Sequence, residues 1–316
     1  MNELKVIKEI EKLLGVELGS YRDDIEDYTG YEVNEAGYIY SLRLGNCSVD
    51  NKRLKKLVEL LSSLKHLNVL WLDENPLTDI SPLKKLPNIR NLALNSDIKV
   101  KKSDLAIFIN LTSLALKWCE MPDSSFLLTL KNIEHLSMIH CFDCDLSHLK
   151  NLNSLKTLEM DECDITDISP LSALINLKKL ILPYNKITDI SALKTMKNLE
   201  SLDLSSSKVT DLSPLKSLKK LKEIDLGFNK VADINALREL KNLETLIFHN
   251  NKIADVSALA GLPKLKEINL MNNKIEDISP LNNLAKNKHA KIIIYGNNIK
   301  KPIDKDAFPA FTDKPY

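Results

Sequence analysis

The amino-acid sequence predicts an α/β fold: a right-handed solenoid of about twelve short coils, with a concave parallel β-sheet on one side and 3-10 turns on the convex side. Three observations predict it: a 22-residue repeat, a strand pattern at the start of each repeat, and two columns of polar residues that follow the strand. A repeat of this length is one structural unit that buries its apolar side only against its neighbours.

The repeat is marked by the first leucine-like residue of a Leu-x-Leu-x-x-Asn pattern. Ten of these residues follow each other in steps of 22: Leu70, Leu92, Leu114, Leu136, Leu158, Leu180, Leu202, Ile224, Leu246 and Ile268. Leu42 lies 28 residues before the first and Ile292 lies 24 residues after the last, which gives twelve coils. Leucines two apart point to the same side of a strand, so each coil is expected to begin with a strand.

The fifth residue after each first leucine forms what we call the turn column. Its members are Cys47, Asn75, Asp97, Cys119, Cys141, Cys163, Asn185, Ser207, Asn229, Asn251, Asn273 and Asn297. An asparagine at a turn satisfies backbone groups as both donor and acceptor. Because four of the five cysteines of the chain lie in this column, we expect them to be small buried residues rather than redox or disulfide groups.

A second column of aspartates precedes Ile-Ser-Pro-Leu or a variant of it. Its members are Asp79, Asp123, Asp145, Asp167, Asp189, Asp211, Asp233, Asp255 and Asp277. An aspartate there can accept backbone N–H bonds of a short helical turn, and proline suits the first turn. We expect capping rather than a calcium site, because the glycine-rich context of calcium-binding solenoids is missing.

The two ends of the stack are expected to carry caps. Residues 2–14 have apolar residues at helical spacing, 31–44 predict two strands around an Asn-Glu-Ala-Gly turn, and 52–67 predict a helix. Ile292–Tyr295 are expected to form the last strand, with Pro302 and the aromatic tail folded over it. We predict one domain over 1–316, made of an N-terminal cap (1–41), repeats (42–299) and a C-terminal cap or tail (300–316).

The coil sequence resembles a known family. The copy at 177–193 reads Leu-Lys-Lys-Leu-Ile-Leu-Pro-Tyr-Asn-Lys-Ile-Thr-Asp-Ile-Ser-Ala-Leu. This spacing is similar to the 22-residue leucine-rich-repeat subclass of bacterial internalins and of a eukaryotic phosphatase-regulating protein, over residues 65–299. The resemblance implies a curved leucine-rich-repeat solenoid that binds proteins with its concave face. The chain departs from internalins in that we find no secretion signal, wall-sorting motif or hydrophobic tail.

Composition narrows the function classes. The formal net charge of +1 gives no global reason to bind nucleic acid or an acidic membrane. No apolar run is long enough for a membrane helix, and the odd number of cysteines indicates a reduced compartment. We therefore expect a cytoplasmic monomer, with secretion as the alternative if a leader precedes Met1. The abundant Lys, Asn and Ile residues suggest a bacterial source.

The expected binding surface consists of the residues one before and one, three and four after each first leucine. We predict twelve partner-binding residues there: Trp71, Asp73, Trp118, His140, Glu159, Asp161, Tyr184, Asp203, Asp225, Phe228, His249 and Tyr295. Exposed aromatic residues that share one face are typical of binding hot spots, although single exposed aromatics are also common. The acidic members favour a protein partner with a basic segment.

Two other groups have competing interpretations. His135, His140, Cys141, Cys144 and His148 are metal-ligand types at close spacing, but the repeat places them on different sides of the coil, so we expect no zinc. Lysines such as Lys178, Lys220, Lys222, Lys264 and Lys266 gather before the strands, where we expect a solvated rim rather than a nucleic-acid stripe.

The sequence therefore predicts a non-catalytic protein-interaction module without cofactors, an intracellular scaffold or regulator. The alternative is an exported, internalin-like adhesion or virulence protein that binds a host receptor. No phosphate loop, nucleophile elbow or paired-histidine zinc helix is present, and an open sheet would exclude too little water for Glu159 and Asp161 to act as an acid–base pair.

Overall fold

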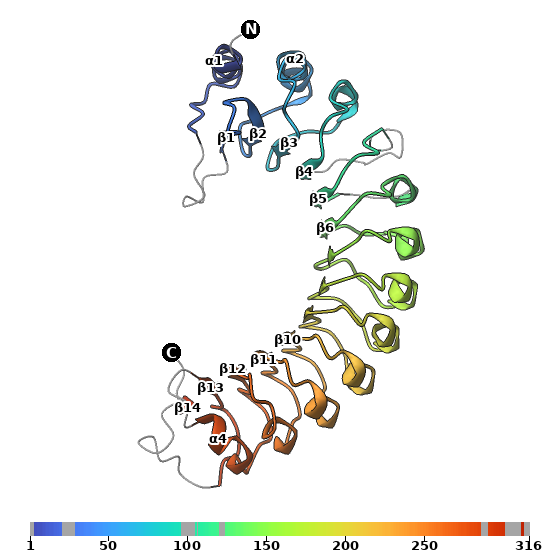
Figure 1. Cartoon of the computed structure of the whole chain (residues 1–316), viewed down its shortest axis with the longest axis vertical. Helices are drawn as coiled ribbons and strands as arrows, with labels where there is room; N and C mark the ends of the chain where they lie inside the picture. Colours follow the sequence, from blue (N-terminus) through green and yellow to red (C-terminus); the bar gives the residue numbers. More distant parts are fainter. Residues whose placement is uncertain are drawn as a thin grey trace. The chain divides into compact units, whose positions relative to one another are not determined.

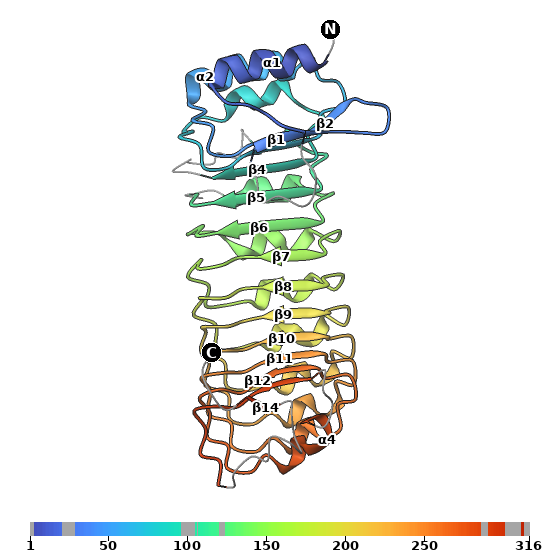
Figure 2. The same cartoon turned by 90° about the vertical axis from the view of Figure 1, so that its left-hand side faces the viewer.

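The computed structural model describes residues 3–20, 29–95, 105, 107–119, 124–285, 290–300 and 311–312. The chain divides into two compact units, Met1–Leu155 and Lys156–Tyr316. In each unit the strands lie side by side along one face, and the 3-10 turns lie along the opposite face (Figure 1; Figure 2). None of the helices within the described ranges is long and apolar enough to cross a membrane.

The first unit begins with a helix and a hairpin. Its helices and strands are α1 (Glu3–Leu14), β1 (Thr29–Val33), β2 (Ile39–Leu44), α2 (Asn51–Leu61), β3 (Val69–Leu72), β4 (Asn91–Asn95), β5 (Ser113–Lys117) and β6 (His135–Ile139). Its 3-10 turns are η1 (Ser81–Lys85), η2 (Ser124–Thr129) and η3 (Leu146–Asn151). β1 pairs antiparallel with β2, and β2 to β6 pair in parallel.

The second unit repeats one coil pattern, in which strand and 3-10 turn alternate. Its strands are β7 (Thr157–Glu159), β8 (Lys179–Ile181), β9 (Ser201–Asp203), β10 (Glu223–Asp225), β11 (Thr245–Ile247), β12 (Glu267–Asn269), β13 (Lys291–Ile293) and β14 (Phe311–Thr312), all parallel to their neighbours. Its helical turns are η4 (Ser169–Ala173), η5 (Ser191–Thr195), η6 (Ser213–Ser217), η7 (Asn235–Glu239), η8 (Ser257–Leu259), η9 (Ser279–Leu281) and α4 (Asn282–Ala285).

The strand register confirms the repeat. Within each unit, every first leucine faces the first leucine of the next coil, as Leu70 faces Leu92 and Leu202 faces Ile224. These residues are almost completely buried, as are the leucines two positions later. Twelve expected coil strands are thus present as β2 to β13, because each coil covers its apolar side only with its neighbours.

The turn column joins consecutive coils. Asn185 donates from Nδ2 to the carbonyls of Leu182 and Pro183 in its own coil and of Met160 in the preceding coil (2.8–3.1 Å), and its Oδ1 accepts the N–H of Ile165 at 2.9 Å. Asn75, Asn229, Asn251 and Asn273 make the same bonds. The sequence predicts that these asparagines bond to backbone groups of their own turn. In the structure they also bond to backbone groups of the preceding coil. Asp97 lies outside the described residues.

The aspartate column caps the 3-10 turns, as predicted. Asp211 accepts the N–H of Ser213 at 2.8 Å on Oδ1, and its Oδ2 accepts the Ser213 hydroxyl at 2.7 Å. These bonds hold the pKa of Asp211 below its usual range. The N–H bond recurs at Asp79, Asp145, Asp167, Asp189, Asp233, Asp255 and Asp277. Asp123 lies outside the described residues.

The ends differ from the sequence prediction in detail. α2 ends at Leu61 rather than near 67, because the N–H groups of Ser63 and Leu64 bond to the carbonyls three residues back, those of Leu60 and Leu61, instead of continuing the α-helical pattern. α1 buries Val6, Ile7, Ile10 and Leu14 and packs against α2. In the tail, Phe311–Thr312 add a strand beside β13, which the sequence did not predict, and Pro302 lies outside the described residues.

Candidate partner-binding face

We call the exposed side of each unit's sheet the strand face. Four predicted binding residues lie on it in the first unit: Trp71, Asp73, Trp118 and His140. Eight lie on it in the second unit: Glu159, Asp161, Tyr184, Asp203, Asp225, Phe228, His249 and Tyr295. All are exposed or half-buried except Asp73, which was expected to be exposed and is only 9% exposed. Its carbonyl accepts the N–H of Asn46 and the Nδ2 of Asn75, which fix it at the inward turn.

The fourth residue after each first leucine adopts a left-handed backbone, and we call this set the left-handed column. Its φ angles lie between 50° and 57° at Asn46, Glu74, Trp118, His140, Glu162, Tyr184, Ser206, Phe228, Asn250 and Asn272, and Gly296 has φ 73°. Asparagine and glycine adopt this conformation most easily, whereas other residues lose about 1 kcal/mol or more. This backbone constraint was not predicted, although the presence of Asn46, Asn250 and Gly296 in one column was a signal for it.

Three aromatic residues occupy the left-handed column in solvent. Trp118 is 55% exposed, Tyr184 62% and Phe228 56%. Neither burial nor backbone preference explains a large aromatic residue at such a position, since both would favour asparagine. These three side chains are therefore the part of the strand face whose presence the fold itself does not require.

Trp118 forms a flat aromatic platform with His140 in the first unit. The two rings are stacked, with centroids 3.7 Å apart and an angle of 9° between their planes. Both residues belong to the left-handed column, in consecutive coils. Their stacking orients the indole ring, which remains 55% exposed.

Phe228 contacts His249 in the second unit. Their rings meet edge to face with centroids 4.9 Å apart. The His249 ring also covers Gly227, where an added Cβ would lie 2.7 Å from the ring, so the absence of a side chain at Gly227 makes room for the imidazole. Burial lowers the pKa of His249, because it disfavours the charged form of the ring.

Asp203 and Asp225 face each other on the neighbouring strands β9 and β10. Asp203 accepts the N–H of Ser205, and Asp225 accepts the N–H of Gly227, each at 2.8 Å. Burial raises the pKa of Asp225 to about 6, the Gly227 bond opposes this rise, and the Asp203 charge adds to it. A cation bound here would relieve the repulsion between the two carboxylates.

Glu159, Asp161 and Tyr295 are half-buried on the second unit's face. They lie at β7 and after β13, on coils other than those of the Asp203–Asp225 and Phe228–His249 pairs. The structure thus assembles local pairs from the predicted residues rather than one continuous site.

The first unit's strand face also has a recess that was not predicted from the sequence. It has a volume of about 170 Å³ and is lined by Trp71, Asp73, Leu92, Ala93, Leu94, Ser113, Ala115 and Lys117. The recess exists because β4 and β5 carry the small residues Ala93 and Ala115 where β3 carries Trp71. Reading the residues one after each first leucine as a column would have shown this run of small side chains.

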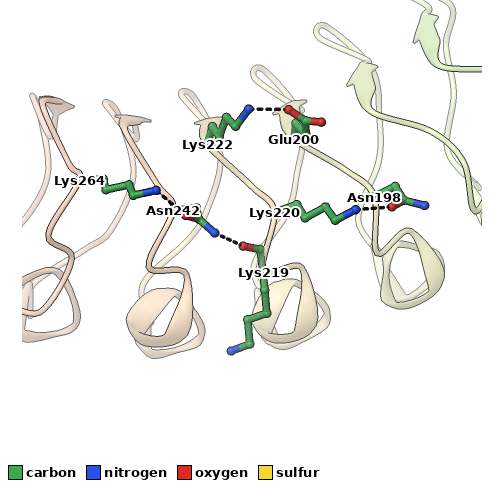
Figure 3. Close-up of polar contacts among 7 residues, drawn as sticks. All are labelled: Asn198, Glu200, Lys219, Lys220, Lys222, Asn242 and Lys264. Atoms are coloured by element: carbon green, nitrogen blue, oxygen red, sulfur yellow. Dashed lines mark hydrogen bonds and ion pairs between the residues drawn. The ribbon is translucent and has the colours of Figure 1, made fainter.

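The lysines beside the strands bond to the preceding coil (Figure 3). The bonds drawn there are Lys220 Nζ to Asn198 Oδ1 (2.7 Å), Lys264 Nζ to Asn242 Oδ1 (2.8 Å), Lys222 Nζ to Glu200 Oε2 (2.6 Å) and Asn242 Nδ2 to the Lys219 carbonyl (2.9 Å). The bond to Glu200 raises the pKa of Lys222. These lysines are exposed, as expected, but they also join coils, which reduces their availability for phosphate groups.

The histidine–cysteine group is dispersed. His148 lies in η3, where its Nδ1 is 2.9 Å from the Ser124 Oγ, whereas His135 lies on β6. Cys141 is buried in the turn column, and its thiol donates to the carbonyls of Leu116 and Ile139. Within the described ranges, no three His, Cys, Asp or Glu residues are placed to hold a metal ion together.

Comparison with known proteins agrees with this architecture. The family model of leucine-rich repeats (two copies) matches residues 153–195, 175–216, 197–239 and 241–283. No curated protein matches the chain in sequence.

Similar solved structures include three internalins of Listeria monocytogenes. InlF is 24% identical with a TM-score of 0.70, and the match covers 99% of this chain and 94% of InlF. Internalin C2 is 31% identical with a TM-score of 0.51, and the match covers 63% of this chain and 83% of that one. The functional domain of InlJ, which includes a cysteine ladder, is 21% identical with a TM-score of 0.64, and the match covers 86% of this chain and 57% of that one. The chain is an internalin-like leucine-rich-repeat protein.

Proposed function

We propose that the chain is a non-catalytic interaction module that binds a protein partner through its strand face, as an intracellular scaffold or regulator. The observation that carries this proposal is the presence of exposed Trp118, Tyr184 and Phe228 at left-handed positions that favour asparagine. Exposed, orientationally fixed aromatic side chains are the usual anchors of protein interfaces. A leucine-rich-repeat fold supports this role, and no catalytic family is indicated.

The chemistry of the face favours a partner segment with basic and apolar side chains. Asp203 and Asp225 offer adjacent carboxylates, and Phe228 stands two coils from Tyr184 in the same column. A nucleic acid is disfavoured as ligand because the face carries acids, and the lysines beside it bond to neighbouring coils. The acidic and aromatic side chains of the face therefore suit a protein surface with basic and apolar residues.

Affinity capture from cells of the source organism tests the proposal. A Trp118→Asn/Tyr184→Asn/Phe228→Asn variant removes the three anchors while placing a favoured residue at each left-handed position. Ile175→Asn is the matched control, because Ile175 is 55% exposed but lies between η4 and β8, outside the strand face. We expect the wild type and the Ile175 variant to recover the same partner and the triple variant to recover at least about tenfold less. Equal recovery by the triple variant would refute the assignment.

An exported adhesion-type role is the second candidate, favoured by the similarity to internalins. In that case the strand face would bind a receptor of another cell. Fractionation of the source cells distinguishes the two roles: the scaffold role predicts the chain in the cytoplasmic fraction, and the adhesion role predicts it at the surface or in the medium.

A further inference from the structure

The recess on the first unit's strand face has the size of one side chain. Its volume of about 170 Å³ is several times the roughly 30 Å³ that a water molecule occupies in the liquid. It is smaller than the ~300 to 1,000 Å³ that is typical of small-molecule pockets. The recess therefore suits a single inserted side chain of a partner rather than a free organic ligand.

One side of the recess is an apolar wall built around Trp71. Trp71 lies on β3, between Arg43 on β2 and Ala93 on β4 in the strand register. The Arg43 guanidinium lies 4.3 Å from the Trp71 ring centroid and forms an ion pair with Glu32 at 3.3 Å. Arg43 thus holds the indole on the β2 side, and its own charge is balanced. The opposite side of Trp71, with Ala93 and Ala115, remains as an apolar wall.

The recess lining includes a carboxylate oxygen that has no hydrogen-bond partner. Asp73 lines the recess, is 9% exposed, and its Oδ1 is buried without a hydrogen-bond partner. Burial and the Asp73 charge raise the pKa of the neighbouring Cys47 thiol to about 11, so Cys47 stays neutral beside the carboxylate. A buried acceptor without a donor is unfavourable, and a ligand that supplies a donor gains from satisfying it. Lys117, also in the lining, is exposed.

We propose that this recess receives one lysine or arginine side chain of a protein partner. The aliphatic stem packs against Trp71, Ala93 and Ala115, and the cationic head is held by the Asp73 carboxylate. This assignment rests on the proposed function in that the side chain belongs to a protein bound on the strand face. It specifies the first unit as the part of the chain that recognises a basic residue.

Fluorescence titration of the full chain tests the proposal. The chain has two tryptophans, so a Trp118→Phe background leaves Trp71 as the only reporter. The probes are blocked Gly-Lys-Gly and Gly-Arg-Gly peptides, with Gly-norleucine-Gly as the uncharged stem control and Gly-Glu-Gly as the opposite charge. We expect a saturable change with lysine and arginine, and at least about tenfold weaker binding of norleucine and glutamate.

Three variants show whether the cationic peptides bind in the recess itself. Asp73→Asn should weaken the cationic peptides about tenfold and leave norleucine unchanged, because it removes the charge and keeps the shape. Lys117→Ala should tighten the cationic peptides, since it removes a like charge. Ala93→Leu should fill the recess and abolish binding of the cationic peptides. This variant tests the recess independently of Asp73, in case the Asp73 variant does not fold.

Four results would overturn the proposal: no saturable response to either cationic peptide, equal binding of norleucine, tighter binding of glutamate, or unchanged binding in Ala93→Leu. These results leave the proposed function intact if partner capture still depends on Tyr184 and Phe228. Conversely, the proposed function fails if partner capture does not depend on the aromatic residues. That result is independent of whether the peptides bind in the recess.

Discussion

Two columns of side chains run through consecutive coils one residue apart, the left-handed column on the strand face and the turn column beneath it. In the turn column, Asn229 is buried, donates to three carbonyls and accepts one N–H. In the left-handed column, its neighbour Phe228 is 56% exposed and contacts one ring. The backbone fixes both positions. The turn-column asparagines bond to backbone groups of the preceding coil, whereas left-handed-column side chains contact side chains of the neighbouring coil, as in the Asn272–Asn250 bond of 3.0 Å and the Trp118–His140 stack.

This difference indicates that the turn column serves stability and leaves the left-handed column available for binding. A residue that satisfies the backbone of two coils can change only at a cost in folding free energy, so the turn column is set by structure. A residue that points into solvent from a left-handed position is free to change, and its most stable choice is asparagine. We therefore propose that the exposed aromatic side chains of Trp118, Tyr184 and Phe228 serve binding.

The largest effect is expected in the turn column. Asn229→Ala removes three donated bonds and one accepted bond from buried backbone groups, and we expect it to destabilise the protein by about 3 kcal/mol. Ser207→Ala is the matched control in the same column, because the Ser207 hydroxyl makes one long bond of 3.5 Å to the Asn185 carbonyl. Urea unfolding followed by circular dichroism measures both. A loss in Asn229→Ala no larger than in Ser207→Ala would break the comparison.

A smaller loss is expected where cysteine occupies the turn column. The Cys141 thiol makes two long contacts with backbone carbonyls, of 3.4 and 3.5 Å, and a hydrogen bond with Cys119, so Cys141→Ala should cost about 1 kcal/mol, mostly from lost packing. Its pKa is raised, first by the hydrogen bond with Cys119 and then by burial. Thiol labelling of the native protein should accordingly modify the half-buried Cys144 well before Cys141. Rapid labelling of Cys141 would contradict its buried role.

Replacing Asp225 on the strand face is expected to make the protein more stable at pH 7. The Asp225 pKa of about 6 in the folded state lies above the value of about 3.9 in an unfolded chain, so the folded state binds the proton more tightly. Stability should then fall as the pH rises from about 4 to about 6 and remain lower above it. Asp225→Asn keeps an acceptor for Gly227 and should add about 1 kcal/mol at pH 7, allowing for solvent screening.

Urea unfolding at pH 4 and pH 7 measures this gain. Glu223→Gln is the control, since Glu223 is an exposed acid of the same strand. If Asp225→Asn raises the free energy of unfolding equally at both pH values, or no more than Glu223→Gln does, burial of the Asp225 charge does not destabilise the protein.

Much of the fold follows from the sequence because leucine spacing encodes both strand and burial. Leu202 and Leu204 are two residues apart in a strand, and both are buried as this spacing predicts. Asp211 precedes Leu-Ser-Pro and caps the 3-10 turn, as its position predicts. The tail strand at Phe311 was not predictable, because it has no repeat spacing and depends on the exposed edge of β13.

The candidate site was only partly predictable, because its properties depend on neighbouring coils. The sequence places Phe228 and His249 on one face, but their edge-to-face contact requires the space above Gly227. The burial of Asp73 and the recess beside it depend on Trp71, Ala93 and Ala115 together. Such features require reading across coils as well as along them.

One measurement tests the separation of stability and binding directly: urea unfolding and partner capture with the same Tyr184→Asn/Phe228→Asn variant. Tyr184 is the cleaner of the two positions, because it is 62% exposed. We predict a stability equal to the wild type or higher by up to about 1 kcal/mol, because asparagine suits the left-handed backbone, together with a loss of partner capture of about tenfold or more. A variant that is clearly less stable, or one that captures the partner as well as the wild type, would contradict this account.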